Sequence, residues 1–276
     1  MRKLKKENPS RSLLSIWISR VNCSIFFDPA RWPHRELISK VAALTIIAVF
    51  LGMRIHHFDR FPQIYHDARN FYAAVTTAEG QPVYCQWQIG ALWGIKLAMW
   101  LIETAIYLGY ISAYASRASA VKIARGFMET AFPVMVAGLP ILIALMPYNL
   151  PRWAPYSASR HLYFSLGIAA LTLCGGVINL IGLLTLRRAF TIMSEARELI
   201  EHGIFSYIRH PLYTGHFIMF LGSLLLRLHP VTVAMYLFFC VGQVLRAKIE
   251  ERKLKEAFPR YEAYQRRTGM FFPKIR

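Results

Sequence analysis

The sequence predicts an all-α, polytopic integral membrane protein with four long transmembrane helices, a C-terminal helical hairpin and a basic cytoplasmic tail. The first observation is composition: 55% of the 276 residues are hydrophobic and the mean hydropathy is +0.33, which is too apolar for an ordinary soluble domain. The second is a set of four long apolar stretches. The third is the uneven distribution of the 33 Lys and Arg residues around these stretches.

Each apolar stretch is about long enough to cross a ~30 Å hydrocarbon core as a helix. Backbone N–H groups in lipid must be satisfied within their own segment, which favours helices. The strands of an outer-membrane barrel would alternate apolar and polar residues, and these stretches do not. The four stretches are residues 37–53, 88–113, 126–146 and 162–186.

The basic residues predict how these helices are oriented. If the four spans alternate, 25 of the 33 Lys and Arg residues share one side of the membrane, and the two opposite loops hold 5. This is the positive-inside pattern with both termini cytoplasmic. We expect the plasma or inner membrane in a bacterium and the endoplasmic reticulum in a eukaryote. The net charge of +18 then favours anionic lipid as the partner, and no nucleic acid.

The N-terminal residues 13–27 predict an interfacial helix on the cytoplasmic face. Trp17 would anchor this helix at the membrane surface. Arg20 breaks the apolar run, and no small-residue cleavage site follows it, which argues against a signal peptide.

Neither the cysteines nor the histidines predict a metal site or a disulfide framework. The cysteines are isolated and lack zinc-site spacing, so free thiols are expected. The outer loop carries metal-capable residue types, but its pattern is more typical of a solvated loop, and no metal is expected. The cysteines are Cys23, Cys85, Cys174 and Cys240, and the loop residues are His56, His57, Asp59, His66 and Asp67.

The chain divides into two parts. Residues 1–160 hold the interfacial helix and three spans with little polar content, and we expect this part to lie on the substrate side. Residues 161–276 hold the fourth span, a charged connector, the hairpin and the basic tail. No glycine-rich phosphate loop is present, so any nucleotide-like cofactor would be held outside a Rossmann domain.

The predicted hairpin consists of two short apolar runs. Residues 212–228 would give a helix of ~25 Å and residues 231–245 one of ~22 Å at 1.5 Å per residue, and both are marginal for a full crossing. Pro230 suits the first turn of the second helix. The runs form either a tight hairpin that enters from the cytoplasm and returns, or two short spans. Both arrangements leave His210 and Arg246 near the same surface.

Polar residues begin the first hairpin helix. Arg209 and His210 precede Pro211, where free N–H groups and the helix dipole attract anions. Tyr213 follows His210 by three residues, so both side chains can face one cavity. Two small residues on one face, Gly215 and Gly222, permit close helix contact.

Charged residues are expected to end the second hairpin helix. Arg246 and Glu250 are four residues apart and therefore neighbours on one helix face, whereas Glu251 points about 100° away. An exposed pair of this kind is usually only solvated, but ionisable groups at membrane depth tend to mark sites. Beyond them, Phe258, Tyr261 and Tyr264 form an aromatic stripe, which is either a lid packed on the hairpin or part of the site.

Four linked features resemble the isoprenylcysteine carboxyl methyltransferase family of integral membrane methyltransferases and, more loosely, the membrane phospholipid methyltransferases. The resemblance covers roughly residues 190–273, and residues 1–160 carry no matching motif. The features are residues 194–200 leading to Gly203, the Arg209-His210-Pro211-x-Tyr213-x-Gly215 core, Arg246-x-x-x-Glu250-Glu251, and Phe258-x-x-Tyr261-x-x-Tyr264 with a later Pro273.

The resemblance implies S-adenosylmethionine (SAM) as methyl donor, bound in a cytoplasmic-side cavity that the connector and tail cover. It implies catalytic roles for Arg246 and Glu250, with Arg246 facing the acceptor. Family members often have Tyr where this chain has Phe205, so the ring is kept and the hydroxyl is absent. The implied cofactor-binding residues are Leu199, Ile200, Phe205, His210, Pro211, Tyr213 and Glu250.

The acceptor is expected to be embedded in lipid or prenylated. A carboxylate acceptor, as in prenylcysteine O-methylation, is already ionised at pH 7 and needs no base, and Arg246 would orient it. An amine or thiol acceptor, as in phospholipid N-methylation or S-methylation, must lose a proton, which Glu250 or Glu251 could take. Two alternatives of other classes are a sterol-reductase-like oxidoreductase and a non-catalytic membrane scaffold.

Overall fold

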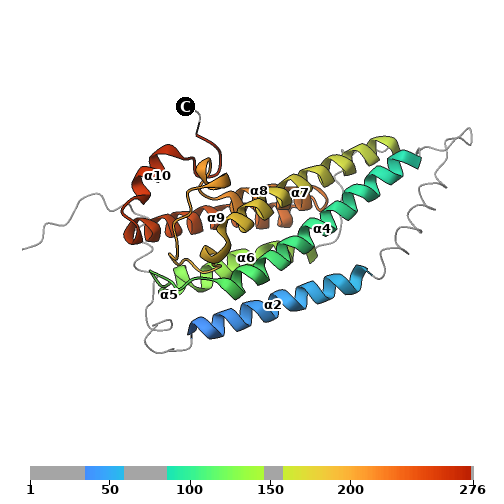
Figure 1. Cartoon of the computed structure of the whole chain (residues 1–276). Coiled ribbons are helices and arrows are strands. Elements are labelled where there is room, and N and C mark those ends of the chain that lie inside the picture. Colours follow the sequence, from blue (N-terminus) through green and yellow to red (C-terminus); the bar gives the residue numbers. More distant parts are fainter. Residues whose placement is uncertain (1–34, 59–85, 146–157, 275–276) are drawn as a thin grey trace, which may run out of the picture.

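The computed structural model describes residues 35–58, 86–145 and 158–274, and this part of the chain is all-helical, without β-strands. Its long helices run roughly parallel to one another as an elongated bundle, with a smaller helical region at one end (Figure 1). The long helices are α2 (Arg35–Phe58), α4 (Gln86–Ser116), α6 (Ala131–Leu145), α7 (Ala158–Leu186), α8 (Pro211–Leu225) and α9 (Pro230–Ala257).

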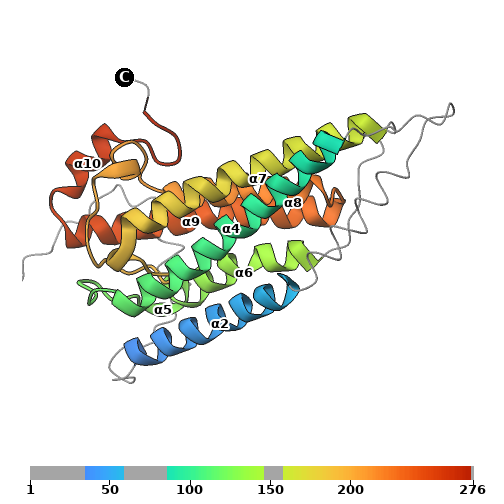
Figure 2. The same cartoon turned by 45° about the vertical axis from the view of Figure 1, so that its right-hand side comes forward.

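The bundle has an inner group and an outer edge. Helix α7 packs against both α4 and α8, α9 packs against α6 and α8, and α2 lies beside α4 at the edge (Figures 1 and 2). The short elements gather at the end of the bundle where α9 finishes. They are α5 (Gly126–Glu129), the 3₁₀ turns η2 (Arg187–Ala189) and η3 (Gly203–Ser206), and α10 (Tyr261–Arg267).

Within the described residues, three helices are long and apolar enough to cross a membrane, namely Trp93–Ser116, Tyr163–Ala189 and Pro230–Ala257. Two of them correspond to the second and fourth predicted spans. The first and third predicted spans contain shorter apolar helices, Lys40–Gly52 and Ala131–Pro140. The helical membrane class is therefore confirmed, whereas the count of four long spans is not.

The third predicted span is interrupted near its start. Helix α5 ends at Glu129, and α6 begins at Ala131. The Thr130 hydroxyl donates to the Gly126 carbonyl oxygen at 2.6 Å, which offers the backbone a local alternative to continuing the helix. The break keeps Glu129, which is buried, outside the apolar helix that follows.

Helix α9 is much longer than predicted. The sequence pattern predicts an end near Arg246 and Glu250, but the helix continues to Ala257. It has 28 residues, or ~42 Å at 1.5 Å per residue. The apolar run stops at Leu245, yet the following Arg, Ala, Lys, Glu and Leu residues are strong helix formers. Pro259 then prevents continuation. Arg246 and Glu250 consequently lie in the middle of a rigid helix and not at its frayed end.

Close packing of α8 on α7 depends on the predicted glycines. A Cβ atom at Gly215 would lie 2.7 Å from the Gly175 carbonyl oxygen, and one at Gly222 would lie 2.1 Å from Thr172 Oγ1. These distances leave no room for any side chain, so the two helices approach nearly backbone to backbone. The contact fixes α8 and, with it, the polar residues at its N-terminal end.

Several predictions fall on residues outside the described ranges. The interfacial helix 13–27, Cys23, Cys85 and the loop residues from Asp59 to Asp67 are among them. In the described part, Cys174 and Cys240 are free thiols, as predicted. The described residues contain no group of three or more metal-capable side chains.

Candidate functional site

One cavity of about 550 Å³ lies where α8, α9, the connector after η2 and α10 meet. All eight of the predicted site residues line it. They are Leu199, Ile200, Phe205, His210, Pro211, Tyr213, Arg246 and Glu250. Three chain segments separated by up to about 50 residues thus converge on one space, as their resemblance to a single family implied.

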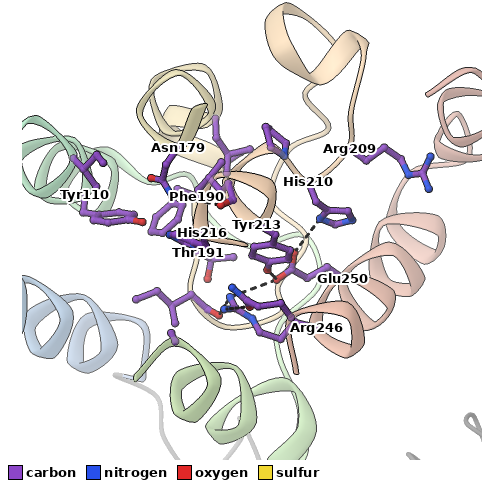
Figure 3. Close-up of a pocket in the computed structure, with 18 of the residues that line it drawn as sticks. Tyr110, Asn179, Phe190, Thr191, Arg209, His210, Tyr213, His216, Arg246 and Glu250 are labelled. Carbon is purple, nitrogen blue, oxygen red and sulfur yellow. Dashed lines mark hydrogen bonds and ion pairs between the residues drawn. The ribbon is translucent and has the colours of Figure 1, made fainter. Parts of the chain in front are cut away.

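Glu250 lies at the polar centre of the cavity. The Tyr213 hydroxyl donates a hydrogen bond to Glu250 Oε1. The His210 ring stacks on the Tyr213 ring, with centroids 5.3 Å apart and planes 4° from parallel. The Nδ1 atom of His210 lies 4.0 Å from Glu250 Oε2. Figure 3 shows these three side chains together beside Arg246. The Glu250 side chain keeps 19% exposure, so its carboxylate can still meet a ligand.

Arg246 is held firmly beside Glu250. Its Nη1 donates to Gln243 Oε1 at 3.1 Å, and its Nη2 donates to the Ile192 carbonyl oxygen at 2.9 Å. Its Nη2 lies 3.7 Å from Glu250 Oε1, and its guanidinium lies over the Tyr213 ring at 5.0 Å. A planar guanidinium fixed on several sides is suited to orienting a ligand.

Glu251 belongs to a different set of contacts from Glu250. Its Oε1 accepts from Arg209 Nε at 2.7 Å and lies 3.3 Å from His210 Nε2, and its Oε2 accepts from Gln265 at 2.8 Å. Glu251 does not line the cavity. The prediction that it could act as a base for the acceptor therefore has no support in the geometry, because its carboxylate joins α9, the start of α8 and α10.

The predicted anion site at the start of α8 is largely occupied by the protein itself. The backbone N–H groups of Arg209 and His210 donate to the Gly269 and Met270 carbonyl oxygens. The Arg209 guanidinium, besides binding Glu251, donates to the carbonyl oxygens of Gln265 and Thr268. The tail thus uses most of the donors that the sequence suggested for a ligand.

The connector and the tail close one side of the cavity. Tyr261 and Tyr264 pack on Leu199 in one buried cluster, and the Tyr264 hydroxyl donates to the Phe205 carbonyl oxygen at 2.8 Å. Burial raises the pKa of both phenols, so both remain neutral at physiological pH. Because both tyrosines also line the cavity, the aromatic stripe is at once a lid and part of the wall.

Sequence reasoning missed a buried ion-pair cluster that anchors this region. Glu129 lies 2.7 Å from Lys253 Nζ and accepts from Arg252 at 3.0 Å, and its backbone carbonyl accepts from Ser194 N–H at 2.9 Å. The signal was present, since Glu129 is the single charged residue in the stretch 126–146, and an ionisable group there requires a partner.

The second group of missed residues lines the deeper part of the cavity. Its walls are mostly apolar and come from α2, α4, α6, α7, α8 and α9. Polar side chains among them include Tyr110, His216 and Gln243, and Figure 3 labels the first two. His216 follows Tyr213 by three residues and so shares its helix face, which is the signal that could have found it. Apolar lining residues include Ile106, Ala137, Met219, Phe220 and Phe239.

Comparison with known proteins agrees with this geometry. Residues 168–256 match the sequence profile of the isoprenylcysteine carboxyl methyltransferase (ICMT) family. The matched residues include the connector, the start of α8 and the Arg246–Glu250 pair. The core of this chain is ICMT-like. Within this ICMT-like core lie all eight predicted site residues, whereas Tyr261 and Tyr264 of the lid follow it.

Individual relatives match part of the chain. The protein-S-isoprenylcysteine O-methyltransferase of Saccharomyces cerevisiae is 28% identical over 127 residues, or 44% of this chain and 53% of its own length. A probable protein-S-isoprenylcysteine O-methyltransferase of Oryza sativa subsp. indica is 30% identical over 112 residues, 38% of this chain and 59% of its own.

A bacterial relative bears a different name. The cobalt-zinc-cadmium resistance protein CzcN of Cupriavidus metallidurans is 35% identical over 78 residues, 28% of this chain and 36% of its own length. This chain therefore spans between about a third and three fifths of the length of these three relatives. The relatives that match this chain bear different names, so the similarity does not by itself specify an acceptor.

Proposed function

We propose that this protein is a SAM-dependent membrane methyltransferase that methylates a carboxylate on a lipid-embedded, isoprenoid-type acceptor, as in prenylcysteine O-methylation. The observation that carries the proposal is the single cavity in which a carboxylate, Glu250, and a fixed guanidinium, Arg246, lie side by side under an aromatic lid. One group suits a cationic donor, and the other suits an anionic acceptor.

The cofactor half of the cavity fits SAM chemically. The Glu250 carboxylate complements the positive sulfonium and amino groups of SAM. Tyr213, His210 and Phe205 offer aromatic surface for an adenine ring. The Tyr261 hydroxyl is buried, lines the cavity and has no hydrogen-bond partner in the described part of the chain. A ribose hydroxyl or a ring nitrogen of the cofactor would satisfy it.

The acceptor half fits an apolar chain that ends in a polar group. The deep walls are apolar, as is usual for ligand sites in which a few polar groups set the orientation. Arg246 stands between these walls and Glu250, so a chain lying in the deep part would present its head group toward the cofactor half. Methyl transfer needs mainly this alignment, because holding two reactants in line supplies a large part of the rate.

When bound, SAM supplies a methyl group whose S–CH₃ bond breaks as an O–CH₃ bond to the acceptor forms, leaving S-adenosylhomocysteine. The acceptor carboxylate is ionised at pH 7, so no protein group has to remove a proton. Arg246 holds and orients this carboxylate, while Tyr213 fixes the Glu250 rotamer. The buried lid residues exclude water from the reacting groups.

The position in the membrane is also part of the proposal. We infer four spans with both termini cytoplasmic, α8 and α9 forming a hairpin, and the tail on the cytoplasmic side. Residues 1–160 would then form the substrate side, and residues 161–276 the methyltransferase core. This topology puts Glu250 and the lid near the cytoplasm, where SAM is available, and the deep walls within reach of lipid.

Two measurements test the function. Purified protein should bind SAM, which calorimetry detects as heat and a melting curve as a higher melting temperature. A sample that shows neither would contradict the enzyme proposal and favour a membrane scaffold. Total membranes incubated with methyl-labelled SAM should then yield a lipid-soluble label that base releases, since an ester is base-labile. A label that resists base would instead indicate an amine or thiol acceptor.

A further inference from the structure

His216 is a cavity residue that the site described above does not use. It lines the cavity one helical turn after Tyr213 on α8, and its ring stacks on Phe220 with centroids 5.8 Å apart. Its Nδ1 is buried and has no hydrogen-bond partner among the described residues. Such a group is destabilising unless something satisfies it, and in native proteins it calls for an explanation.

Arg246 carries a second unsatisfied group in the same region. Its Nε is buried and likewise lacks an acceptor among the described residues. Because Gln243 and the Ile192 carbonyl hold its two terminal nitrogens, the guanidinium cannot turn to satisfy Nε without breaking these bonds. Both side chains line the same cavity, and Figure 3 shows them within one group.

We propose that His216 and Arg246 together hold the acceptor's carboxylate, and that His216 is the residue that selects a carboxylate over a neutral analogue. This inference rests on the proposed function and names a second residue for its acceptor site. A carboxylate offers two oxygens and only accepts hydrogen bonds. Arg246 Nε–H supplies a charge-assisted donor, and the imidazole N–H of His216 supplies a second.

The same pair of groups disfavours the other acceptor classes. An ammonium group between Arg246 Nε and His216 would face the positive guanidinium without gaining an acceptor from it, since an arginine side chain only donates. A carboxamide presents only one oxygen, and its NH₂ group would confront donors. A carboxylate whose two oxygens each accept one hydrogen bond keeps a second lone pair on each oxygen for attack on the methyl group, so the clamp orients the nucleophile without blocking it.

The test measures binding and does not depend on turnover. Wild-type protein saturated with S-adenosylhomocysteine is titrated with an N-acetyl S-prenylcysteine carboxylate and with the matching carboxamide. We expect the wild type to prefer the carboxylate by roughly 10–100-fold, the range for a charged hydrogen-bonded contact. His216→Phe removes the neutral donor and keeps Arg246, so it should lower this preference by roughly 3–10-fold and leave S-adenosylhomocysteine affinity unchanged.

Three variants separate the donor role from packing. His216→Asn retains a side-chain N–H and should keep most of the preference. His216→Leu replaces His216→Phe if the latter gives aggregated protein. His202→Phe, a change of an exposed histidine outside the cavity, should alter nothing.

The outcomes are distinguishable. Equal binding of the two ligands by the wild type, or full preference in His216→Phe, would overturn the inference while leaving the proposed function in place. Equal loss in His216→Asn and His216→Phe would also overturn it, because the role would then be one of shape. Failure of the wild type to bind S-adenosylhomocysteine would remove the proposed function itself.

Discussion

Glu250 and Glu251 are adjacent in sequence, and the structure predicts that replacing each with glutamine has a different consequence. Glu250 faces the cavity and contacts Tyr213 and Arg246. Glu251 faces away and binds Arg209 and Gln265. We expect Glu250→Gln to lose cofactor affinity with little change in stability, and Glu251→Gln to lose stability first.

The magnitudes follow from burial. The Arg209 and Glu251 side chains are 9% and 10% exposed, and breaking a buried ion pair costs about 3–5 kcal/mol. Arg209 keeps two backbone carbonyl acceptors, which reduces the expected loss to about 2–4 kcal/mol. This corresponds to a drop of roughly 5–10 °C in melting temperature for a chain of this size.

For Glu250→Gln the expected loss is one charged contact to SAM. Such a contact contributes about 1.5–3 kcal/mol, which is roughly a 10–100-fold weaker affinity. The glutamine carbonyl can still accept from Tyr213, so the melting temperature of the variant without ligand should stay within ~2 °C of wild type.

The assay is a melting curve in detergent with and without SAM, together with calorimetric titration of both variants. The double replacement of Arg209 and Glu251 by leucine is the control, since removing both charges should be less harmful than removing one. The reasoning is refuted if Glu251→Gln melts like wild type and loses SAM affinity as Glu250→Gln does. The two carboxylates would then share one role.

Four further changes test other parts of the site. Arg246→Ala should lower turnover at least ~100-fold while the protein still inserts and folds. Arg246→Lys should not restore turnover, because a single ammonium cannot reach the separate acceptors that hold the guanidinium. Near-normal methyl transfer by the alanine variant in liposomes would contradict the acceptor role. Tyr213→Phe should lower turnover less, by roughly tenfold, since it removes one hydrogen bond and keeps the ring. Gly215→Ala should prevent monodisperse purification because its Cβ would lie 2.7 Å from a backbone oxygen of α7, whereas Gly138→Ala, with no atom within 4 Å, should behave as wild type. Glu201→Gln should speed SAM dissociation up to ~5-fold, because it releases Arg260 and Arg267 of the tail, which pair with Glu201. High salt should have the same effect on the wild type, since it screens exposed ion pairs.

The sequence predicted the parts of the protein that depend on local pattern. Apolar length predicted the helices, and Pro211 and Pro230 correctly placed the starts of α8 and α9. The spacing of Gly215 and Gly222 predicted a close helix contact, which α7 provides. The eight site residues that the resemblance implies all line one cavity, although they come from segments that are far apart along the chain.

The tertiary structure decided which segments that are distant along the chain contact each other, and no local sequence pattern contains this information. The sequence placed Glu251 about 100° from Glu250 around the helix but left both as possible bases, since their contacts come from α8 and α10, segments distant along the chain. It ended α9 where hydrophobicity ends, although helix propensity carries the helix on to Ala257. The ion pair of Glu129 with Lys253 spans more than a hundred residues. The spacing of His216 from Tyr213 could have suggested a shared face, but which residues lie opposite His216 depends on how α8 packs against its neighbours. Residue types and spacing fix helices and motifs, but the partner of a buried charge depends on which distant segment the packing brings beside it.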